Sequence, residues 1–580
     1  MYAKHLAFKK KARQQIFNIW DLLAIILVVW FFIMLSNSMS YMRSPLPESL
    51  GTPLSLDPKH LPEYIFRSII RVLIALFASI IFSIIYALIA AKNKYLQKAM
   101  ISLLDILQSI PILGYLSFTM TGFIALAPTT MLGIEMAVIF TVFTCQVWNI
   151  TYSIYQSIIT IPESIKNTDA VFKLNPVQRF LLIELPYAIP PLVWNIMISV
   201  SASWFFVVAS EAIIEGNNNF YLPGIGAYIA SAIDAQNLNA IFYAIGALTI
   251  VILLYDRLCF RPLVNWSEKF KYDLNQQPTI LHNSWNEKLA KRSRVAHFLW
   301  YPVKKIQTYL LSHRFGTVNN TRAAMEPKPS KYEWLKRIMW FMAITSGTCY
   351  AFYKIAIFLY YTVTFDEIKH TLYLGFITTI RILVIMVLTT IFWLPISLYI
   401  GFSPKLAKIV QPLALMLASF PANILFPLCV YLIQRYNLNP DIWLSVLFIL
   451  SIQWYLVFNI ISGATMFPQN LREIVKSFDI KGVKLMCKVI VPAILPYFLV
   501  GAITAWGSAW NATIIAEFAK WGETTLEATG IGQYVTVASN AGNMPKIVLG
   551  ILVMLLYIEI FNRLFWRPIF RYAESLEQLK

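Results

Sequence analysis

The chain has 580 residues, of which 58% are hydrophobic and only 13% are charged. Soluble domains carry about a quarter charged residues, so this composition excludes an ordinary soluble globular protein. The 48 Lys+Arg outnumber the 29 Asp+Glu, but the basic residues fall in short loops between apolar stretches, which follows the positive-inside rule and argues against a nucleic-acid partner. The five cysteines show no paired or CxxC spacing, so neither a disulfide framework nor a metal site is predicted.

The first apolar stretch, near residues 19–39, follows a basic N-terminus. A signal peptide would begin in the same way, but no small-residue cleavage site follows, and the apolar run extends beyond a usual signal core. We interpret this stretch as a retained first span whose basic end lies in the cytoplasm.

About 20 mostly apolar residues are needed to cross a bilayer, and two sets of such stretches follow one another along the chain. They lie near residues 19–39, 63–91, 99–125, 131–158, 186–213 and 238–260, and then near 337–361, 371–402, 408–433, 442–466, 492–518 and 545–566. The expected fold is an all-α polytopic membrane protein with about 12 transmembrane helices. The basic turns predict that both termini are cytoplasmic.

The two sets are copies of each other. Arg71 and Pro111 match Arg381 and Pro421 at an offset of 310 residues. After a four-residue adjustment the offset is 306, and rare residues continue to match, as in the pairs Trp148/Trp454, Pro186/Pro492, Trp204/Trp510 and Glu211/Glu517. Since each copy has six spans, both share one orientation, which predicts two parallel six-helix repeats.

A polar, strongly basic segment joins the copies. The predicted domains are therefore a first repeat at 1–262, a cytoplasmic connector at 263–336 and a second repeat at 337–580. Basic and aromatic residues alternate in the connector, as in a helix that lies on a membrane surface. A solvated linker attracted to anionic headgroups and a partner-binding segment both remain open.

Each copy has a long cytoplasmic segment before its fifth span. The segments read "IPESIKNTDAVFKLNPVQRFLLIELPYAIP" and "FPQNLREIVKSFDIKGVKLMCKVIVPAILP". Each contains a polar helical stretch, a break and a basic amphipathic helix, and then enters the membrane at Pro-x-x-x-Pro. A helix–turn–helix at the membrane surface is suited to docking a partner, although surface helices that only cap the bundle would have the same pattern.

These segments resemble the EAA loop of the permeases of binding-protein-dependent ABC importers, EAA-x3-G-x9-I-x-L-P. In the second copy Glu473, Ile474 and Val475 occupy the EAA positions, Asp479 the Gly position, and Val489, Val491 and Pro492 the tail. In the first copy these positions hold Asn167, Thr168, Asp169, Lys173, Ile183, Leu185 and Pro186. Both glycines and most of the EAA residues are replaced, while the tail is retained.

The remainder of each copy is similar to nitrate/sulfonate/taurine-type permeases, and the whole chain resembles the duplicated permease component of anion ABC systems. The resemblance implies the type I ABC importer permease fold, a place in a bacterial inner membrane, and transport of a small anion such as nitrate, a sulfonate or bicarbonate. It also implies two cytoplasmic ABC ATPase subunits and an extracytoplasmic substrate-binding protein as partners. The chain contains no GxxxxGK[ST], so ATP and Mg belong to the partners, no cofactor is expected here, and the chain is not expected to be an enzyme.

The resemblance implies that the cytoplasmic segments couple the permease to the ATPase. The candidate coupling residues are Pro162, Glu163, Asn167, Thr168, Asp169, Lys173, Pro468, Glu473, Ile474, Asp479 and Gly482.

Charged residues within the spans are candidates for a function by default. Arg71 lies 21 residues before Lys92, or about 31 Å of helix, and is therefore expected near the outer surface, as is its match Arg381. Glu211 and Glu517 lie at the outer end of the fifth spans. We expect structural ion pairs between these arginines and glutamates, with contact to an entering anion and a gating role as the alternatives.

Trp204 and Trp510 lie on the fifth spans, where they are either pathway residues or belong to an interfacial aromatic belt. Only the second copy adds polar neighbours, Asn511 and Thr513. If the pathway makes polar contacts with its substrate, this asymmetry favours the second copy.

A glycine-flanked turn occurs in both copies after the fifth span, at Gly224 and Gly226 and at Gly530 and Gly532. Two glycines around an isoleucine permit a tight turn, followed by a short outer helix that contains Tyr228 or Tyr534. Such a turn closes the outer rim or acts as a gate.

Two other functions are compatible with parts of the pattern. A twelve-span ion-coupled secondary transporter also uses parallel repeats, but it has no use for the long cytoplasmic segments, and the spans lack acidic or histidine relays. A membrane scaffold without transport activity would explain the loss of the EAA glycines.

Overall fold

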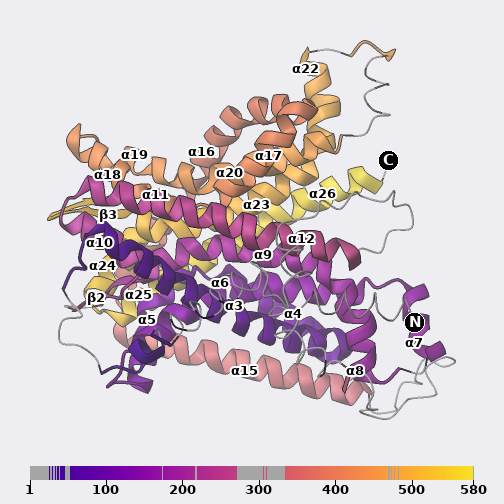
Figure 1. Cartoon of the computed structure of the whole chain (residues 1–580), viewed down its shortest axis with the longest axis horizontal. Coiled ribbons are helices and arrows are strands. Elements are labelled where there is room, and N and C mark those ends of the chain that lie inside the picture. The colour runs from indigo at the N-terminus through magenta and orange to yellow at the C-terminus, as the bar shows by residue number, and fades with distance from the viewer. Residues whose placement is uncertain are drawn as a thin grey trace, which may run out of the picture. The chain divides into compact units, whose positions relative to one another are not determined.

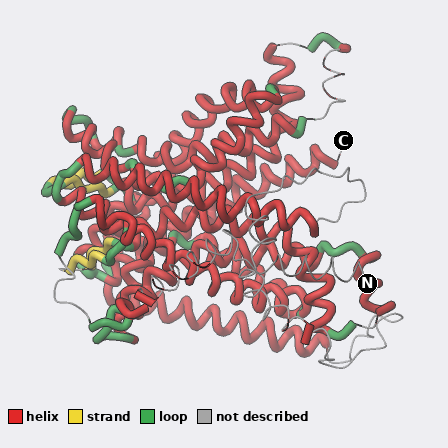
Figure 2. The backbone as a smooth tube through the Cα atoms, viewed as in Figure 1, coloured by secondary structure: helices red, strands yellow, loops and turns green. Residues whose placement is uncertain are grey.

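The computed structural model describes residues 52–172, 174–215, 218–270, 333–467 and 482–578, and isolated positions within 25–45, 305–309 and 471–480. In these ranges the chain is helical apart from two short antiparallel hairpins (Figures 1 and 2). Most of the predicted first span, near 19–39, and most of the connector lie outside the described residues.

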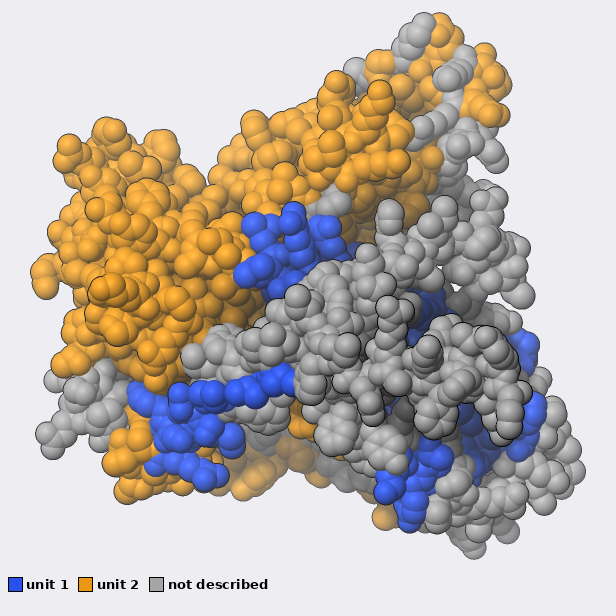
Figure 3. Space-filling view, in the orientation of Figure 1, with its two compact units in different colours: residues 1–43, 152–197, 253–334 blue, residues 44–151, 198–252, 335–580 orange. Residues whose placement is uncertain are grey.

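The chain divides into two compact units (Figure 3). The smaller unit comprises residues 1–43, 152–197 and 253–334, and the larger comprises 44–151, 198–252 and 335–580. The larger unit draws on both sequence copies and contains all the clusters and cavities described below. The predicted boundaries at 262/263 and 336/337 follow the sequence repeat instead and stay a prediction.

The described elements of the first repeat alternate long helices with short turns. They are α3 (Leu61–Lys92), α4 (Lys94–Ser109), η3 (Ile112–Tyr115), α5 (Leu116–Leu126), α6 (Leu132–Ile159), α7 (Glu163–Phe172), α8 (Pro176–Arg179), η4 (Phe180–Glu184), α9 (Leu185–Ser210), β1 (Ala212–Glu215), β2 (Asn218–Tyr221), α10 (Ile225–Asp234), α11 (Leu238–Tyr255), η5 (Asp256–Phe260) and α12 (Arg261–Ser267).

After its first span the second repeat follows the order of the first, with two differences. Its described elements are α15 (Glu333–Thr362), α16 (Phe365–Phe402), α17 (Pro404–Ser419), η7 (Ala422–Ile424), α18 (Phe426–Arg435), α19 (Pro440–Trp443), α20 (Ser445–Thr465), α22 (Gly482–Leu485), η8 (Met486–Ile490), α23 (Val491–Ala516), β3 (Phe518–Trp521), β4 (Thr524–Glu527), α24 (Ile531–Asn540), α25 (Met544–Phe561), η9 (Asn562–Trp566) and α26 (Arg567–Gln578). The short helix α19 is added before α20, and no described element corresponds to α7. The repeat extends to fine detail, because the π-helical turns η4 and η5 fall 306 residues before η8 and η9.

Eight helices in the described residues are long and apolar enough to cross a membrane. They confirm the predicted spans at 63–91, 131–158, 186–213, 238–260, 371–402, 442–466, 492–518 and 545–566. The predicted span at 337–361 is the continuous helix α15.

Two predicted spans, at 99–125 and 408–433, are not continuous helices. The first breaks at Pro111 between α4 and η3, and the second breaks at Pro421 between α17 and η7, where the two arms differ in direction by 72°. Both prolines have extended backbone, with ψ of 115° and 107°. Proline has no N–H and its ring collides with the preceding helical turn, so a helix ends at this position. Hydropathy alone does not distinguish such a broken helix from a continuous one.

The hairpins occupy equivalent places in the two repeats. β1 pairs with β2 from Ala212↔Tyr221, and β3 pairs with β4 from Phe518↔Glu527. Each hairpin follows a fifth-span helix, α9 or α23, and leads into a short helix, α10 or α24, and Figure 1 shows these elements near one another. We refer to this end of the larger unit as the hairpin end.

Candidate functional site

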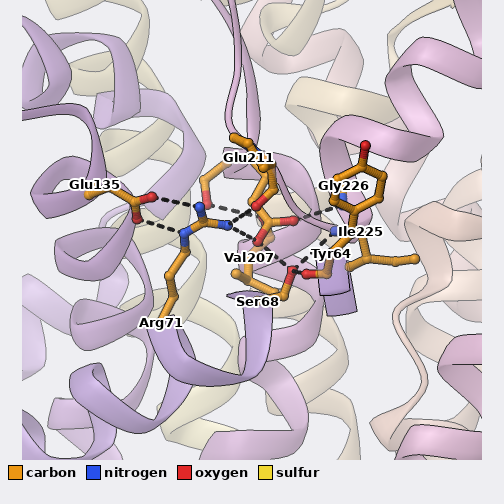
Figure 4. A network of polar contacts seen from close by, with 10 residues as sticks. Tyr64, Ser68, Arg71, Glu135, Val207, Glu211, Ile225 and Gly226 are labelled. Carbon is orange, nitrogen blue, oxygen red and sulfur yellow. Dashed lines mark hydrogen bonds and ion pairs between the residues drawn. The ribbon is translucent and has the colours of Figure 1, made fainter. Parts of the chain in front are cut away.

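A buried cluster of charges joins α3, α9 and the start of α10 (Figure 4). Arg71 Nη1 lies 2.6 Å from Glu211 Oε1, so the ion pair expected from the sequence is present. Ser68 Oγ also donates to Glu211 Oε1, at 2.6 Å, and the Gly226 N–H donates to Oε2, at 2.7 Å. We call this arrangement of arginine, glutamate and glycine turn the first clasp.

Arg71 has a second acidic partner, on α6. Its Nε and Nη2 atoms each lie 2.7 Å from one oxygen of Glu135, which makes the pair bidentate (Figure 4). The side chains of Arg71 and Glu135 are both 2% exposed. Planar guanidinium and carboxylate groups match each other in this geometry, which adds directional specificity to the electrostatic attraction.

The Glu211 carboxylate occupies the N-terminus of α10. Besides Gly226, the Ile225 N–H is satisfied through Ser68 Oγ, at 3.1 Å. The first N–H groups of a helix have no partner within the helix and carry partial positive charge, so a carboxylate is favoured there. Glu211 is therefore stabilised by both Arg71 and the helix end, and the guanidinium of Arg71 is shared by two buried carboxylates.

The glycines of the turn are required by proximity rather than by an unusual backbone conformation. Gly224 has extended backbone, with φ of −177°. A Cβ atom at Gly224 would lie 2.3 Å from the Glu211 carboxylate, and one at Gly226 would lie 2.1 Å from the Val208 carbonyl oxygen. The short helix that was expected after each turn is present, as α10 and α24. A tight turn alone does not explain the glycines, because a side chain there would also collide with neighbouring atoms. A side chain at either position would separate the turn from the glutamate.

The second repeat contains the same clasp. Arg381 Nη1 lies 2.5 Å from Glu517 Oε1, and Thr378 Oγ1 and the Gly532 N–H donate to the same carboxylate at 2.8 and 2.7 Å. A Cβ atom at Gly530 would lie 2.2 Å from Glu517 Oε2. The second clasp therefore also needs its glycine turn.

The third member differs between the clasps. Asp441 occupies the position of Glu135 at the 306-residue offset, and its Oδ1 atom lies 3.5 Å from Arg381 Nη2. The Asp441 side chain is 52% exposed and also accepts from the Thr529 N–H at 2.7 Å. Arg381 is 11% exposed, whereas Arg71 is 2% exposed. The first clasp is sealed, and the second clasp opens to its surroundings.

A central cavity of about 300 Å³ lies between equivalent elements of the two repeats. The first repeat contributes residues of α4, η3, α6 and α9, and the second contributes residues of α17, η7, α20 and α23. Among the described residues that line it, none is charged; the polar groups are hydroxyls, amides, indoles and the Cys145 thiol. The cavity can offer hydrogen bonds to a small polar solute without a fixed charge that would trap it.

Two hydrogen bonds cross between the repeats at the edge of this cavity. The Ile112 N–H, at the start of η3, donates to Asn511 Oδ1 at 2.8 Å, and Asn423 Nδ2 donates to the Phe205 carbonyl oxygen at 3.0 Å. Asn511 and Phe205 are equivalent at the 306-residue offset. Each broken helix is therefore joined to the fifth-span helix of the other repeat, and both asparagines come from the second repeat.

A second cavity, of about 420 Å³, shares Gln108, Ile503, Gly507 and Asn511 with the central cavity. It continues along α23 to Asp105, Glu559, Arg563 and Arg567, all of which line it. The two cavities therefore adjoin each other, and the second extends to charged side chains that the central cavity lacks.

Of the other predicted pathway residues, some line a cavity and some do not. Trp510 lines the second cavity and Asn511 lines both cavities, whereas Trp204 is buried and lines neither of them. Thr513 is fully buried and its hydroxyl donates to the Trp510 carbonyl oxygen, so it contacts its own helix. Asn511 is engaged with Ile112 and with the Gly507 carbonyl oxygen.

The predicted coupling segment of the first repeat is helical. Pro162 precedes α7, which begins at Glu163 and contains Asn167, Thr168 and Asp169. Lys173 lies outside the described residues. Asn175 then begins α8 with a reciprocal capping box with Gln178, so the expected helix–turn–helix is present.

In the second coupling segment, Pro468 and Ile474 lie outside the described residues, and Glu473 is exposed in a helical stretch. Asp479 has φ of +47°, and the Ile480 N–H donates to the Val475 carbonyl oxygen. A helix that ends in this way places its last residue in the left-handed region, where glycine is favoured and aspartate is tolerated. Asp479 occupies the position to which the resemblance assigned a glycine. Gly482, with φ of +62°, is the next left-handed residue.

Several residues of the site were not selected from the sequence. Glu135 and Asp441 complete the clasps, and Trp148 and Trp454 line the central cavity from the two repeats. The matched tryptophans were visible as a repeat signal, and the match of Glu135 with Asp441 was available at the same offset. In the described parts of the chain, no group of three or more His, Cys, Asp or Glu residues could hold a metal ion.

A duplicated set of membrane helices around a shared polar cavity is the architecture of a transport permease. Residues 79–258 and 394–565, more than half of the chain, match the family of the binding-protein-dependent transport system inner membrane component. The chain belongs to this family. It is therefore a multi-span membrane subunit of a transporter rather than an enzyme.

Curated relatives agree with this assignment. The nitrate import permease protein NrtB of Synechocystis sp. is 30% identical over 244 residues, which is 40% of this chain and 83% of that protein. The bicarbonate transport system permease protein CmpB of the same organism is 29% identical over 121 residues, 21% of this chain and 41% of that protein. NrtB of Leptolyngbya laminosa is 26% identical over 161 residues, 28% of this chain and 53% of that protein.

Proposed function

We propose that the chain forms the complete translocation pathway of an ATP-driven importer for a small anion of the nitrate or bicarbonate class. The similarity to nitrate and bicarbonate permeases supports the substrate class. The uncharged central cavity supports it as well, because hydroxyl, amide and indole groups can bind an oxyanion weakly enough to release it.

The proposed partners are two cytoplasmic ATPase subunits and an extracytoplasmic substrate-binding protein. ATP and Mg would be bound by the ATPases, because the chain has no phosphate-binding loop. The segments at 163–176 and 469–482 would dock the ATPases, and the helix–turn–helix of α7 and α8 supports this role. The hairpin end would face the binding protein, and both termini would be cytoplasmic, which agrees with the basic turns between the spans.

The observation that carries the proposal is the cavity itself. Its walls are the same elements taken twice, once from each repeat, and the second cavity adjoins it. Gly507 lines both cavities, and a Cβ atom there would meet nothing within 4 Å. A side chain at Gly507 would therefore fill the path without first straining the helix.

We test the proposal by anion uptake into proteoliposomes that contain the chain, its ATPase and its binding protein, with nitrate and bicarbonate as the probes. The wild-type chain should import one of them only when ATP is supplied. Gly507→Trp should block uptake and leave assembly with the ATPase intact, whereas Gly507→Ala should transport. Val500→Trp is the matched control, because it adds the same side chain to the same helix at a residue that is 48% exposed.

Two outcomes would contradict the proposal. Uptake driven by an ion gradient without ATP would make the chain a secondary transporter. Undiminished uptake by Gly507→Trp would place the pathway elsewhere in the chain.

A further inference from the structure

One ion pair at the hairpin end joins the two repeats. Lys520, on β3 of the second repeat, has its Nζ atom 3.1 Å from Oδ1 of Asp234, the last residue of α10 in the first repeat. Tyr221 donates its hydroxyl to the other oxygen of Asp234, at 2.5 Å. Burial and the adjacent carboxylate raise the pKa of Tyr221, so its hydroxyl remains a donor at neutral pH.

The backbone of the second hairpin reinforces this contact. The Gly522 N–H, at the turn between β3 and β4, donates to the Ile233 carbonyl oxygen at 3.1 Å. Gly522 has φ of +58°, and a Cβ atom there would lie 2.1 Å from the Gln236 side chain. The tip of the hairpin therefore lies directly against the end of α10, and only glycine fits that approach.

The contact lies beside a small cavity at the hairpin end. Tyr221, Asp234, Lys520 and Asn423 line a small cavity of about 200 Å³, whereas Ala422, adjacent to Asn423 in η7, lines the central cavity. The turn η7 thus separates the two spaces. Asn423 holds it against α9 through the Phe205 carbonyl oxygen.

The contact occurs once, although the elements occur twice. At the 306-residue offset, Lys520 corresponds to Ile214 and Asp234 corresponds to Asn540. An isoleucine and an asparagine cannot form an ion pair. The ion pair is therefore specific to one side of the pseudo-symmetric structure and is not a requirement of the fold.

We propose that Lys520, Asp234 and Tyr221 form a latch that holds the hairpin end closed and must open once in each transport cycle. The proposal rests on the importer function proposed above and assigns residues to its outer closure. The Lys520 and Asp234 side chains are 41% and 25% exposed. Since a partly exposed ion pair contributes little net stability, a docking partner can open this latch at low cost.

The first experiment crosslinks the latch. Cysteines replace Asp234 and Lys520 in a chain whose own five cysteines are alanine, and a cleavable bifunctional thiol reagent joins them in the reconstituted complex. Crosslinking should lower anion uptake by about tenfold or more, because the outward-open state is no longer populated, and cleavage of the reagent should restore it. Full uptake with a complete crosslink would overturn the latch.

The ion pair between Lys546 and Glu367 is a matched control. Its Nζ–Oε1 distance is 2.8 Å, and its side chains are 42% and 24% exposed, much like those of the latch. Both residues belong to the second repeat. The same crosslink between Glu367→Cys and Lys546→Cys should therefore leave uptake unchanged.

A second readout needs neither anion nor ATP. Val430, buried at 1% exposure, lines the cavity beneath the latch, and we measure how fast Val430→Cys, in the same background free of other cysteines, reacts with a membrane-impermeant maleimide. Adding Lys520→Ala should raise the rate by about twofold to fivefold, the shift expected from a partly exposed ion pair, because the open state becomes more populated. Adding Lys546→Ala should leave the rate unchanged. An unaltered rate in Lys520→Ala would refute the latch even if the chain transports, and absence of wild-type uptake would instead refute the importer function.

Discussion

The two clasps show what duplication retains and what it allows to change. Both consist of an arginine, a fully buried glutamate, a hydroxyl donor and a glycine turn. The second carboxylate is Glu135, bidentate and 2% exposed, in the first clasp, and Asp441, 3.5 Å from Arg381 and 52% exposed, in the second. The shared part positions the short helix at the hairpin end. The part that differs determines how firmly the arginine is held.

The largest expected effect comes from the arginines. Arg71→Gln leaves two buried carboxylates without their cation and should destabilise the chain by about 3–5 kcal/mol, the usual cost of breaking a buried pair. Arg381→Gln should cost less, because Asp441 is already half exposed and keeps its bond from Thr529. We would measure both by detergent-titrated unfolding of the purified chain. Equal losses would show that the clasps are energetically equivalent despite their different geometry.

Substitutions of the turn glycines test the part that the two clasps share, which is the contact between the glycine turn and the buried glutamate. Gly224→Ala and Gly530→Ala each place a methyl group 2.2–2.3 Å from a glutamate carboxylate, and forced overpacking of this kind costs about 1–3 kcal/mol. The two losses should be similar to each other. Gly246→Ala, within α11 where a Cβ atom meets nothing within 4 Å, is the control and should leave the unfolding midpoint unchanged or raise it, since alanine is favoured over glycine inside a helix. A tolerated Gly224→Ala would mean that the turn is not held by contact with Glu211.

The smallest losses of stability are expected from substitutions of Glu135 and Asp441, the acidic residues in which the two clasps differ. Glu135→Gln keeps the shape but removes one charge-assisted pair, which should cost about 1–3 kcal/mol. Asp441→Asn should fall within about 1 kcal/mol of wild type, as for an exposed ion pair. The same unfolding assay applies. If Asp441→Asn proved the more damaging variant, the half-exposed pair with Arg381 would be worth more than the buried pair with Glu135, because the asparagine amide oxygen can still accept from the Thr529 N–H.

The sequence was sufficient to predict most of the spans and both ion pairs, Arg71 with Glu211 and Arg381 with Glu517. The apolar stretches became helices because a membrane span must satisfy its backbone hydrogen bonds internally. The pair between Arg71 and Glu211 followed from counting helical rise along two spans to the same depth. The sequence did not predict the role of Glu135, although its match with Asp441 at the repeat offset places an acidic residue at the start of both fourth spans.

The helix breaks at the two prolines and the central cavity could not be predicted from the sequence and are seen only in the packed structure. Pro111 and Pro421 were recognised as matched residues, but apolar residues continue on both sides of each proline, so the hydropathy pattern predicted unbroken spans. The cavity lining combines residues about 300–400 positions apart in the sequence, as in the bond between Ile112 and Asn511. Contacts of that kind depend on how the repeats pack, and no local pattern specifies them.

Covalent fusion of the repeats has an evolutionary consequence that the ion pair between Lys520 and Asp234 illustrates. In a homodimer, every substitution appears twice, so a lysine at one position and an aspartate at another would create two identical bonds across the symmetry axis. A single chain with two copies is free of that constraint. Each position can diverge alone, and the relative strength of closure on the two sides of the axis becomes a trait that selection can adjust one residue at a time.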